Sequence, residues 1–143
     1  MLVTTGVETL RYGPNMSKNV DVVREAFAAW EQGNSGPLFK AVAADVSWRV
    51  IGTTPLSGTH HGKVAFRDAT QPFTERLAEP IVAKVLAVHD VGDTVIVQWE
   101  GTSKGTNGRP YNQSYCWVMH LTDAKIDNVV AYLDTALVND IFT

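Results

Sequence analysis

The stretch IVAKVLAVHDVGDTVIVQWEGTS, residues 81–103, decides the fold class. Two runs that contain valine and isoleucine flank the tight turn Val91-Gly92-Asp93, which is typical of two antiparallel strands joined by a hairpin. A loop at residues 104–110, rich in glycine, leads to a third predicted strand at 111–121, and a turn leads to a fourth at 126–133. Residues 134–141 follow as a short helix. The second half of the chain is therefore predicted to be a sheet.

The first half of the chain carries helical periodicity. Residues 17–32 place apolar side chains on one helical stripe, with Ser17 as the predicted N-cap and Gly33 as the predicted C-cap. A short helix follows from Ser35, then a strand at 45–51, a loop at 52–62, and a helix at 63–78 that should kink or restart at Pro72. Helices followed by antiparallel strands predict an α+β fold, with three N-terminal helices packed on a curved, mostly antiparallel sheet and a short C-terminal helix. We expect this arrangement to form a cone with an apolar interior. The stripe of the first helix consists of Val20, Val23, Phe27 and Trp30.

Composition narrows the class of protein. The 143 residues suit one domain, and 45% apolar against 19% charged residues exclude an intrinsically disordered chain. A net charge of −3 argues against a nucleic-acid binder, and no apolar run is long enough to span a membrane. The single cysteine, Cys116, excludes a disulfide framework and is compatible with the cytoplasm, the expected location. No spacing of ligands predicts a metal site, and no cofactor is expected.

The N-terminal segment differs from the rest. Residues 1–15 contain Gly6, Gly13 and Pro14, lack the features of a secretory signal, and end just before Met16. We expect them to be a poorly ordered extension, with the domain spanning residues 16–143.

Three groups of motifs resemble a known family. Phe27-Ala-Ala-Trp30-Glu-Gln-Gly33 ends the first helix, and Pro55-Leu-Ser-Gly-Thr-His-His-Gly62 precedes the third. Gly108-Arg-Pro-Tyr-Asn112, Lys125-Ile126 and Tyr132-Leu-Asp134 close the chain. In this order and spacing they resemble the SnoaL-like, ketosteroid isomerase-related branch of the nuclear transport factor 2-like superfamily, over residues 17–142. That branch contains polyketide cyclases and is related to limonene-type epoxide hydrolases, so the resemblance implies the cone fold but does not fix an activity.

The resemblance places no complete catalytic set on this chain. The epoxide hydrolase Arg and Asp positions correspond to Gln98 and Glu100, and the position of a further Asp, shared with the cyclases, corresponds to Ala131. The isomerase base falls near Arg49, and the isomerase tyrosine falls at Ala26 or Phe27.

The register counted from Gly108 predicts the walls of an internal pocket for a flat, largely apolar metabolite. We expect Glu100 to point inward as an acid–base group whose pKa burial raises. The alternative is that Glu100 pairs with a cation such as Arg49 or Arg109, or points to solvent. Tyr115 is predicted to donate a hydrogen bond to a ligand oxygen, or to be a wall aromatic. A shift of the strand register by one residue would place the other side chains of each strand in the pocket. The remaining predicted lining residues are Phe27, Trp30, Trp48, Gln98, Gln113, Trp117, Met119, Ala131 and Leu133, with His61 at the mouth as a second possible base.

Other polar residues have structural interpretations. Gln98 and Gln113 either orient a ligand or form a cross-strand amide pair, and Asp134 is predicted to cap the last helix.

The outer sheet face supports a partner prediction. By the same register, an apolar stripe faces away from the pocket, and a homodimer through that face would cover it. The stripe consists of Val95, Val97, Trp99, Cys116 and Val118.

Three functions therefore compete. One is a cofactor-free isomerase, lyase or hydrolase, the second is a non-catalytic carrier or sensor of a hydrophobic metabolite, and the third is a protein-interaction module.

Overall fold

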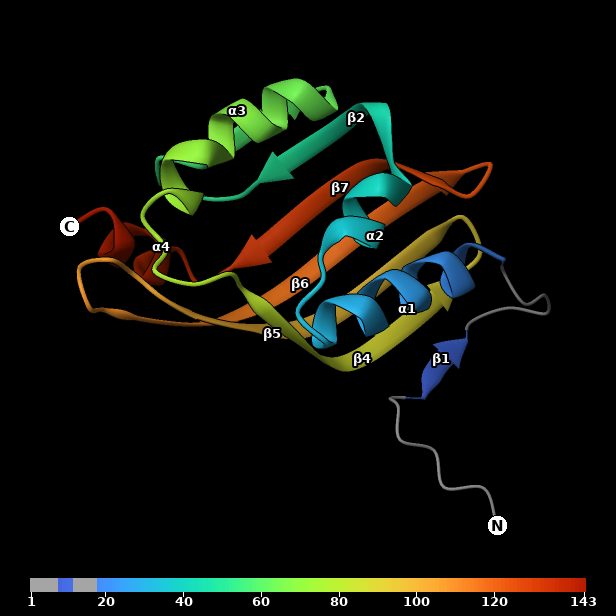
Figure 1. The fold of residues 1–143 in the computed structure, drawn as a ribbon. Helices are drawn as coiled ribbons and strands as arrows, with labels where there is room; N and C mark the ends of the chain where they lie inside the picture. The colour runs from blue at the N-terminus through green and yellow to red at the C-terminus, as the bar shows by residue number, and fades with distance from the viewer. Residues whose placement is uncertain (1–7, 12–17) are drawn as a thin grey trace, which may run out of the picture.

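The computed structural model describes residues 8–11 and 18–143, which form a curved seven-stranded sheet and four helices (Figure 1). The strand order across the sheet is β1-β4-β5-β6-β7-β2-β3. Pairing is antiparallel except between β1 and β4 and between β2 and β7, which are parallel. The α+β class and the mostly antiparallel sheet predicted from the sequence are confirmed. The elements in chain order are β1 (Thr9–Arg11), α1 (Lys18–Glu31), α2 (Gly36–Ala41), β2 (Val42–Val50), β3 (Gly58–His61), α3 (Lys63–Thr74), β4 (Val82–Val91), β5 (Thr94–Lys104), β6 (Pro110–Thr122), β7 (Lys125–Leu133) and α4 (Thr135–Ile141).

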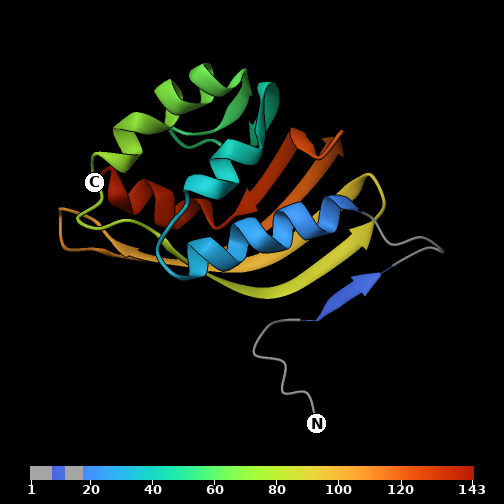
Figure 2. The same cartoon turned by 45° about the vertical axis from the view of Figure 1, so that its right-hand side comes forward.

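Helices α1 and α3 cover different parts of the concave face of the sheet. Helix α1 packs against β4 and β5, and α3 packs against β2 and β3 at the other end of the sheet. Helix α2 contacts both α1 and β2, so it connects α1 to the part of the sheet that α3 covers (Figure 2). The curved sheet and the helices above it enclose a space in which large apolar side chains from both layers meet.

Helix α1 follows its sequence pattern closely. The predicted stripe residues Val20, Val23, Phe27 and Trp30 are all buried. The chain leaves the helix at Gly33, whose φ of +92° favours glycine, and the Gly33 N–H donates to the Trp30 carbonyl at 2.9 Å. The Trp30 indole N–H donates to the Ile81 carbonyl at 2.7 Å, which fixes the end of α1 beside the start of β4.

The side-chain alternation of β5 corrects the predicted register. Val95, Val97 and Trp99 are buried on the inner face, whereas Gln98 and Glu100 are exposed on the outer face. Trp99 pairs with Tyr115 across β5 and β6, so these two side chains share the inner face. The prediction that Gln98 and Glu100 point inward is therefore wrong, as is the outward orientation predicted for the three apolar residues. Burial of the apolar set decides the register, because a shift by one residue would exchange the two faces.

Among the described residues, no ion pair joins Glu100 to Arg49 or Arg109. The cross-strand neighbours of Glu100 on the outer face are Lys84 and Ser114, and Arg109 instead lies 3.8 Å from Asp140. The alternative in which Glu100 faces solvent matches its exposure.

Three local predictions also differ from the structure. The predicted loop at 52–62 contains strand β3, which pairs with β2. Helix α3 continues through Pro72 and ends at Thr74, four residues before its predicted end. Within the predicted extension, β1 pairs in parallel with β4, and the Thr9 hydroxyl accepts a hydrogen bond from Arg24. Residues 1–7 and 12–15 of the extension, together with the predicted cap Ser17, lie outside the described residues.

Candidate functional site: an aromatic cavity

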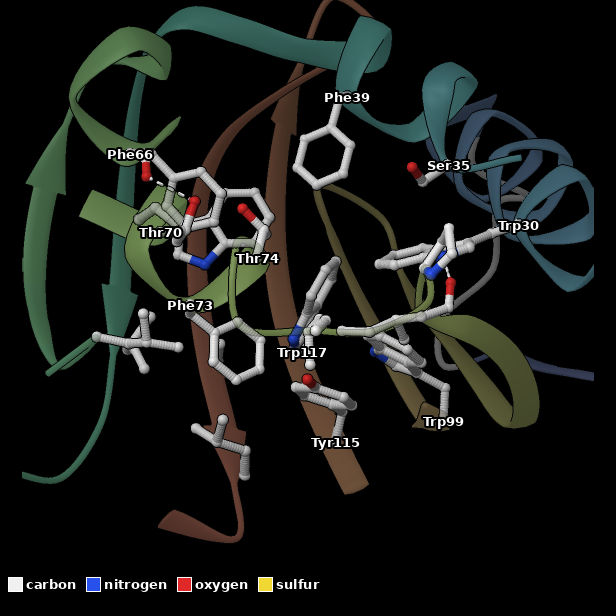
Figure 3. Close-up of a pocket in the computed structure, with 18 of the residues that line it drawn as sticks. Trp30, Ser35, Phe39, Phe66, Thr70, Phe73, Thr74, Trp99, Tyr115 and Trp117 are labelled. Atoms are coloured by element: carbon white, nitrogen blue, oxygen red, sulfur yellow. Dashed lines mark hydrogen bonds between the residues drawn. The ribbon is translucent and has the colours of Figure 1, made fainter. Parts of the chain in front are cut away.

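A cavity of about 490 Å³ lies between the inner face of the sheet, α2, α3 and the segment 77–81 (Figure 3). This volume is in the range of small-molecule sites. The cavity wall is mostly apolar, and its sheet residues come from the adjacent strands β5, β6, β7 and β2. Its lining residues are Trp30, Gly33, Ser35, Phe39, Trp48, Val50, Leu56, Phe66, Thr70, Phe73, Thr74, Leu77, Ala78, Glu79, Pro80, Ile81, Trp99, Tyr115, Trp117, Ala131 and Leu133.

Two stacked pairs of aromatic rings form opposite parts of this wall. Trp48 stacks on Phe66 with ring centroids 4.1 Å apart and planes 25° apart, and Trp99 stacks on Tyr115 at 4.1 Å and 12°. Trp117 meets both tryptophans edge to face, 5.0 Å from Trp48 at 85° and 5.0 Å from Trp99 at 88°. The rings hold one another in place, because each has aromatic neighbours in favourable geometries. A planar apolar molecule would find large, preformed ring surfaces here.

One chain of hydrogen bonds starts at the cavity wall and leads to the start of α4. The Tyr115 hydroxyl oxygen lies 2.7 Å from the Tyr111 hydroxyl oxygen, and the Gln113 amide donates to Tyr111 at 3.2 Å. Gln113 also bonds both backbone groups of Asp134, donating to its carbonyl at 2.8 Å and accepting from its N–H at 2.7 Å. The Asp134 carboxylate accepts from the Ala136 N–H at 3.0 Å, so its predicted role as the cap of α4 is confirmed.

Gln113 therefore has a different role from either that we predicted. It is 1% exposed and lies beneath the wall, between Tyr111 and Asp134. Gln98, its predicted amide partner, is on the outer face, where its carbonyl oxygen lies 3.1 Å from the His89 ring. The cross-strand amide pair does not form, because the two side chains are on opposite faces of the sheet.

Burial keeps the two tyrosines protonated. It raises the pKa of Tyr115 well above the ordinary value, and the neighbouring Tyr111 raises it further. Burial likewise raises the pKa of Tyr111, although its hydrogen bonds with Tyr115 and Gln113 oppose this effect. Both hydroxyls are therefore neutral hydrogen-bonding groups near neutral pH, and neither is a ready base.

Two indole groups at the wall lack hydrogen-bond acceptors. Within the part of the chain that the structure describes, Trp99 Nε1 and Trp117 Nε1 are buried without a partner, whereas Trp30 Nε1 has the Ile81 carbonyl. A buried donor without an acceptor costs about 1–3 kcal/mol. The wall to which these two side chains belong is mostly apolar, and its other polar residues are Ser35, Thr70, Thr74, Glu79 and Tyr115.

Comparison with known proteins identifies the family. The model of the SnoaL-like domain matches residues 23–129, well over half of the chain. The chain belongs to the SnoaL-like family. The resemblance inferred from the motifs, to the SnoaL-like branch of the nuclear transport factor 2-like (NTF2-like) superfamily, is thereby confirmed.

Solved structures share the fold of this SnoaL-like domain at low identity. An NTF2-like protein of unknown function from Burkholderia pseudomallei is 22% identical, with a TM-score of 0.75, over 90% of this chain and 99% of that one. TerC, co-crystallised with polyporic acid, is 17% identical, with a TM-score of 0.73, over 89% and 100%. A putative isomerase from Rhodopseudomonas palustris is 14% identical, with a TM-score of 0.66, over 90% and 98%. None of the curated proteins matches.

The SnoaL-like domain brings together only part of the predicted site. The predicted residues that line the cavity are Tyr115, Trp30, Trp48, Trp117, Ala131 and Leu133. Phe27 and Met119 are buried in the core but do not line it. His61 is exposed and alternates with His60 on β3, and it is the His60 ring that shares the face of Trp48 and lies 2.9 Å from the Leu56 carbonyl oxygen. The prediction of His61 at the cavity mouth is therefore wrong.

Sequence reasoning missed several lining residues. Phe66 and Phe73 lie on the apolar stripe that the sequence shows in α3, and both line the cavity. The predicted register places Trp99 on the wrong face of the sheet, although Trp99 lines the cavity. No sequence pattern in segment 77–81 indicates that this segment borders the cavity. The stripe predicts burial but does not show which buried side chains border an open space.

The lining of the SnoaL-like cavity holds few ionisable groups. Among its lining residues, all within the described part of the chain, these are Tyr115 and Glu79. Glu79 is exposed at the rim, where its backbone carbonyl accepts a hydrogen bond from Ser103 at 2.6 Å. Across residues 8–11 and 18–143, no group of three or more His, Cys, Asp or Glu side chains is placed to hold a metal ion. No helix of these residues is long and apolar enough to cross a membrane.

Proposed function

We propose that this SnoaL-like protein binds a flat, largely apolar metabolite, such as a polyketide-, steroid- or aromatic-like molecule, in its cavity. The observation that carries the proposal is the wall of stacked rings formed by Trp48 with Phe66 and Trp99 with Tyr115, joined by Trp117. Removing planar apolar surface from water contributes about 25 cal/mol per Å², and preformed aromatic walls add stacking. TerC, which shares the fold, was co-crystallised with polyporic acid, which supports a ligand-binding use of this architecture.

The cavity favours binding without acid–base turnover. An isomerase, lyase or hydrolase of the predicted kind needs a base that reaches the ligand. Ala131 lines the wall where the resemblance implies an acid in the cyclases, and Glu100 is on the outer face. Glu79 is at the rim, and Tyr115 stays protonated. We therefore propose a carrier or sensor of the ligand in preference to an enzyme.

The test is binding of a panel of planar apolar compounds, followed by calorimetry with two matched variants. Ala131→Phe places a ring inside the cavity, and Tyr132→Phe, one residue along β7, changes the outer face. We expect Ala131→Phe to lower affinity at least about tenfold through lost volume, and Tyr132→Phe to leave it unchanged. Equal binding by wild type and a folded Ala131→Phe variant would place the ligand elsewhere and contradict the proposal.

We also propose that the protein forms a homodimer through the outer face of the sheet. The predicted stripe is revised, because Val95, Val97 and Trp99 are buried on the inner face. Cys116 and Val118 of the predicted stripe stay in the proposed outer-face group, which also includes Tyr132 with a side chain 45% exposed. Light scattering at micromolar concentration should give twice the monomer mass, and a monomer there would rule the dimer out. The revised group consists of Ile96, Cys116, Val118, Val130 and Tyr132.

A further inference from the structure

The amide of Gln113 has only one orientation compatible with its neighbours. Its Oε1 accepts from two backbone N–H groups, those of Asp134 at 2.7 Å and Ser114 at 3.0 Å. Its Nε2 donates to the Asp134 carbonyl at 2.8 Å. Exchanging the amide oxygen and nitrogen would set donors against donors and an acceptor against an acceptor. The second hydrogen on Nε2 is therefore directed to the Tyr111 oxygen, 3.2 Å away.

The orientation of the Gln113 amide determines which tyrosine donates in the hydrogen bond between Tyr111 and Tyr115. The side chain of Tyr111 is fully buried, and its oxygen accepts from Gln113, so its own O–H needs an acceptor. The Gln113 oxygen already serves two backbone donors, and the Tyr115 oxygen at 2.7 Å is the one remaining acceptor among the described residues. Tyr111 therefore donates to Tyr115.

Tyr115 then has a proton with no protein acceptor. Its oxygen receives the hydrogen bond from Tyr111, and no further acceptor for its O–H occurs among the residues that the structure describes. The side chain lines the cavity, and its stacking on Trp99 at 4.1 Å fixes the plane of the ring (Figure 3). The chain of hydrogen bonds thus runs from the backbone at the start of α4 to a donor at the cavity wall.

We propose that Tyr115 is a fixed hydrogen-bond donor that selects, among flat apolar ligands, those carrying a neutral carbonyl oxygen, as in a ketone or a quinone. This inference rests on the proposed function, because it concerns a ligand in the same cavity. A hydrocarbon of the same shape leaves the Tyr115 proton without an acceptor, and a carbonyl satisfies it. The carbonyl is neutral because, within the described part of the chain, no Lys, Arg or His lines the cavity to balance an anion.

The high pKa of Tyr115 agrees with this role. Burial keeps the hydroxyl protonated, so the donor persists across the neutral range. The preference for a carbonyl ligand should therefore be the same at pH 6 and at pH 8.

The test uses fluorenone and fluorene, two planar tricyclic probes that differ by a carbonyl in place of a methylene group. Calorimetry gives the ratio of their affinities for wild type, Tyr115→Phe and Tyr132→Phe. We expect the fluorenone-to-fluorene ratio to fall about threefold to tenfold in Tyr115→Phe, which is the contribution of one hydrogen bond. Tyr132→Phe is the matched control, because it removes an exposed hydroxyl on the outer face and should leave the ratio as in wild type.

The outcomes separate this inference from the proposed function. If wild type binds neither probe, both are refuted. If wild type binds both and the ratio is the same in Tyr115→Phe, only the carbonyl selection is refuted.

A second measurement does not depend on a folded variant. The infrared stretch of the fluorenone carbonyl, measured on the wild-type complex, should lie at lower frequency than in hexane, because a hydrogen bond weakens the C=O bond. A stretch at the hexane frequency would overturn the inference even if Tyr115→Phe does not fold.

Discussion

Replacing Gln113 with leucine should destabilise the protein strongly, although the two side chains are similar in size. The substitution removes both hydrogen bonds to the Asp134 backbone, at 2.7 and 2.8 Å, the bond from the Ser114 N–H at 3.0 Å and the bond to Tyr111 at 3.2 Å. Each backbone group left without a partner costs about 1–3 kcal/mol, with the lower part of that range applying at the start of α4, where Asp134 is near solvent. We expect a loss of about 2–4 kcal/mol in the free energy of unfolding.

Urea unfolding followed by tryptophan fluorescence measures this loss. With an m-value of about 1.5 kcal/mol/M, the midpoint should fall by about 1–3 M. Gln98→Leu is the matched control, since Gln98 is exposed on the outer face, and its substitution should change stability by less than about 0.5 kcal/mol. If the two variants unfold at the same urea concentration, the hydrogen bonds of Gln113 do not stabilise the start of α4. The donor directions derived from the orientation of Gln113 would then have no support.

Three further predictions concern single carboxylates. Asp134→Ala should cost about 0.5–2 kcal/mol in urea unfolding, because the cap of α4 is lost, and an unchanged midpoint would contradict the cap. Burial acts to raise the pKa of Asp127, but hydrogen bonds from Thr122 and His120 outweigh it, so the net effect is a lowered pKa. The stability that Asp127 contributes is therefore present above its ordinary pKa of 3.8 and is lost as the pH falls through the lower pKa of the folded protein. Urea midpoints measured between pH 5 and pH 2 should thus fall less steeply for Asp127→Asn than for wild type, and parallel curves would refute this. Glu100→Gln should leave probe affinity unchanged in calorimetry, because Glu100 is on the outer face, and a change of tenfold or more would restore it to the site.

Local features of the fold could be predicted because neighbouring residues determine them. The α1 stripe, the positive φ at Gly33 and the cap at Asp134 each depend on residue types within one or two turns of helix. The pairing of β1 with β4 could not be predicted, because it joins residues far apart in sequence and the segment around β1 carries no strand pattern.

The alternation of residue types along β5 by itself predicts which of its side chains face inward. Val95, Val97 and Trp99 alternate with more polar positions, which by itself places the apolar set inside. Counting from Gly108 reversed this assignment, because the parity depends on the hairpin loop that follows Lys104, which pairs with Pro110. A loop one residue longer would have brought Glu100 opposite Tyr115, and a loop one residue shorter would have brought it opposite Gln113.

The site itself depends on geometry that a sequence pattern does not carry. Tyr111 and Tyr115 are four residues apart, about 13 Å along a straight strand, yet their hydroxyl oxygens lie 2.7 Å apart. This contact requires the two side chains to lean toward each other above Gln113. The cavity likewise exists because bulky rings from α2, α3 and the sheet support one another at a distance, whereas hydrophobic patterning predicts only that these rings are buried.

A crystal structure of the protein with fluorenone is the most direct test of ligand binding in the aromatic cavity. We predict electron density for the tricyclic probe inside the cavity, in contact with Trp48, Trp117 and Tyr115. Density for the probe only on the outer face of the sheet, or a cavity that stays empty at saturating fluorenone, would contradict the account.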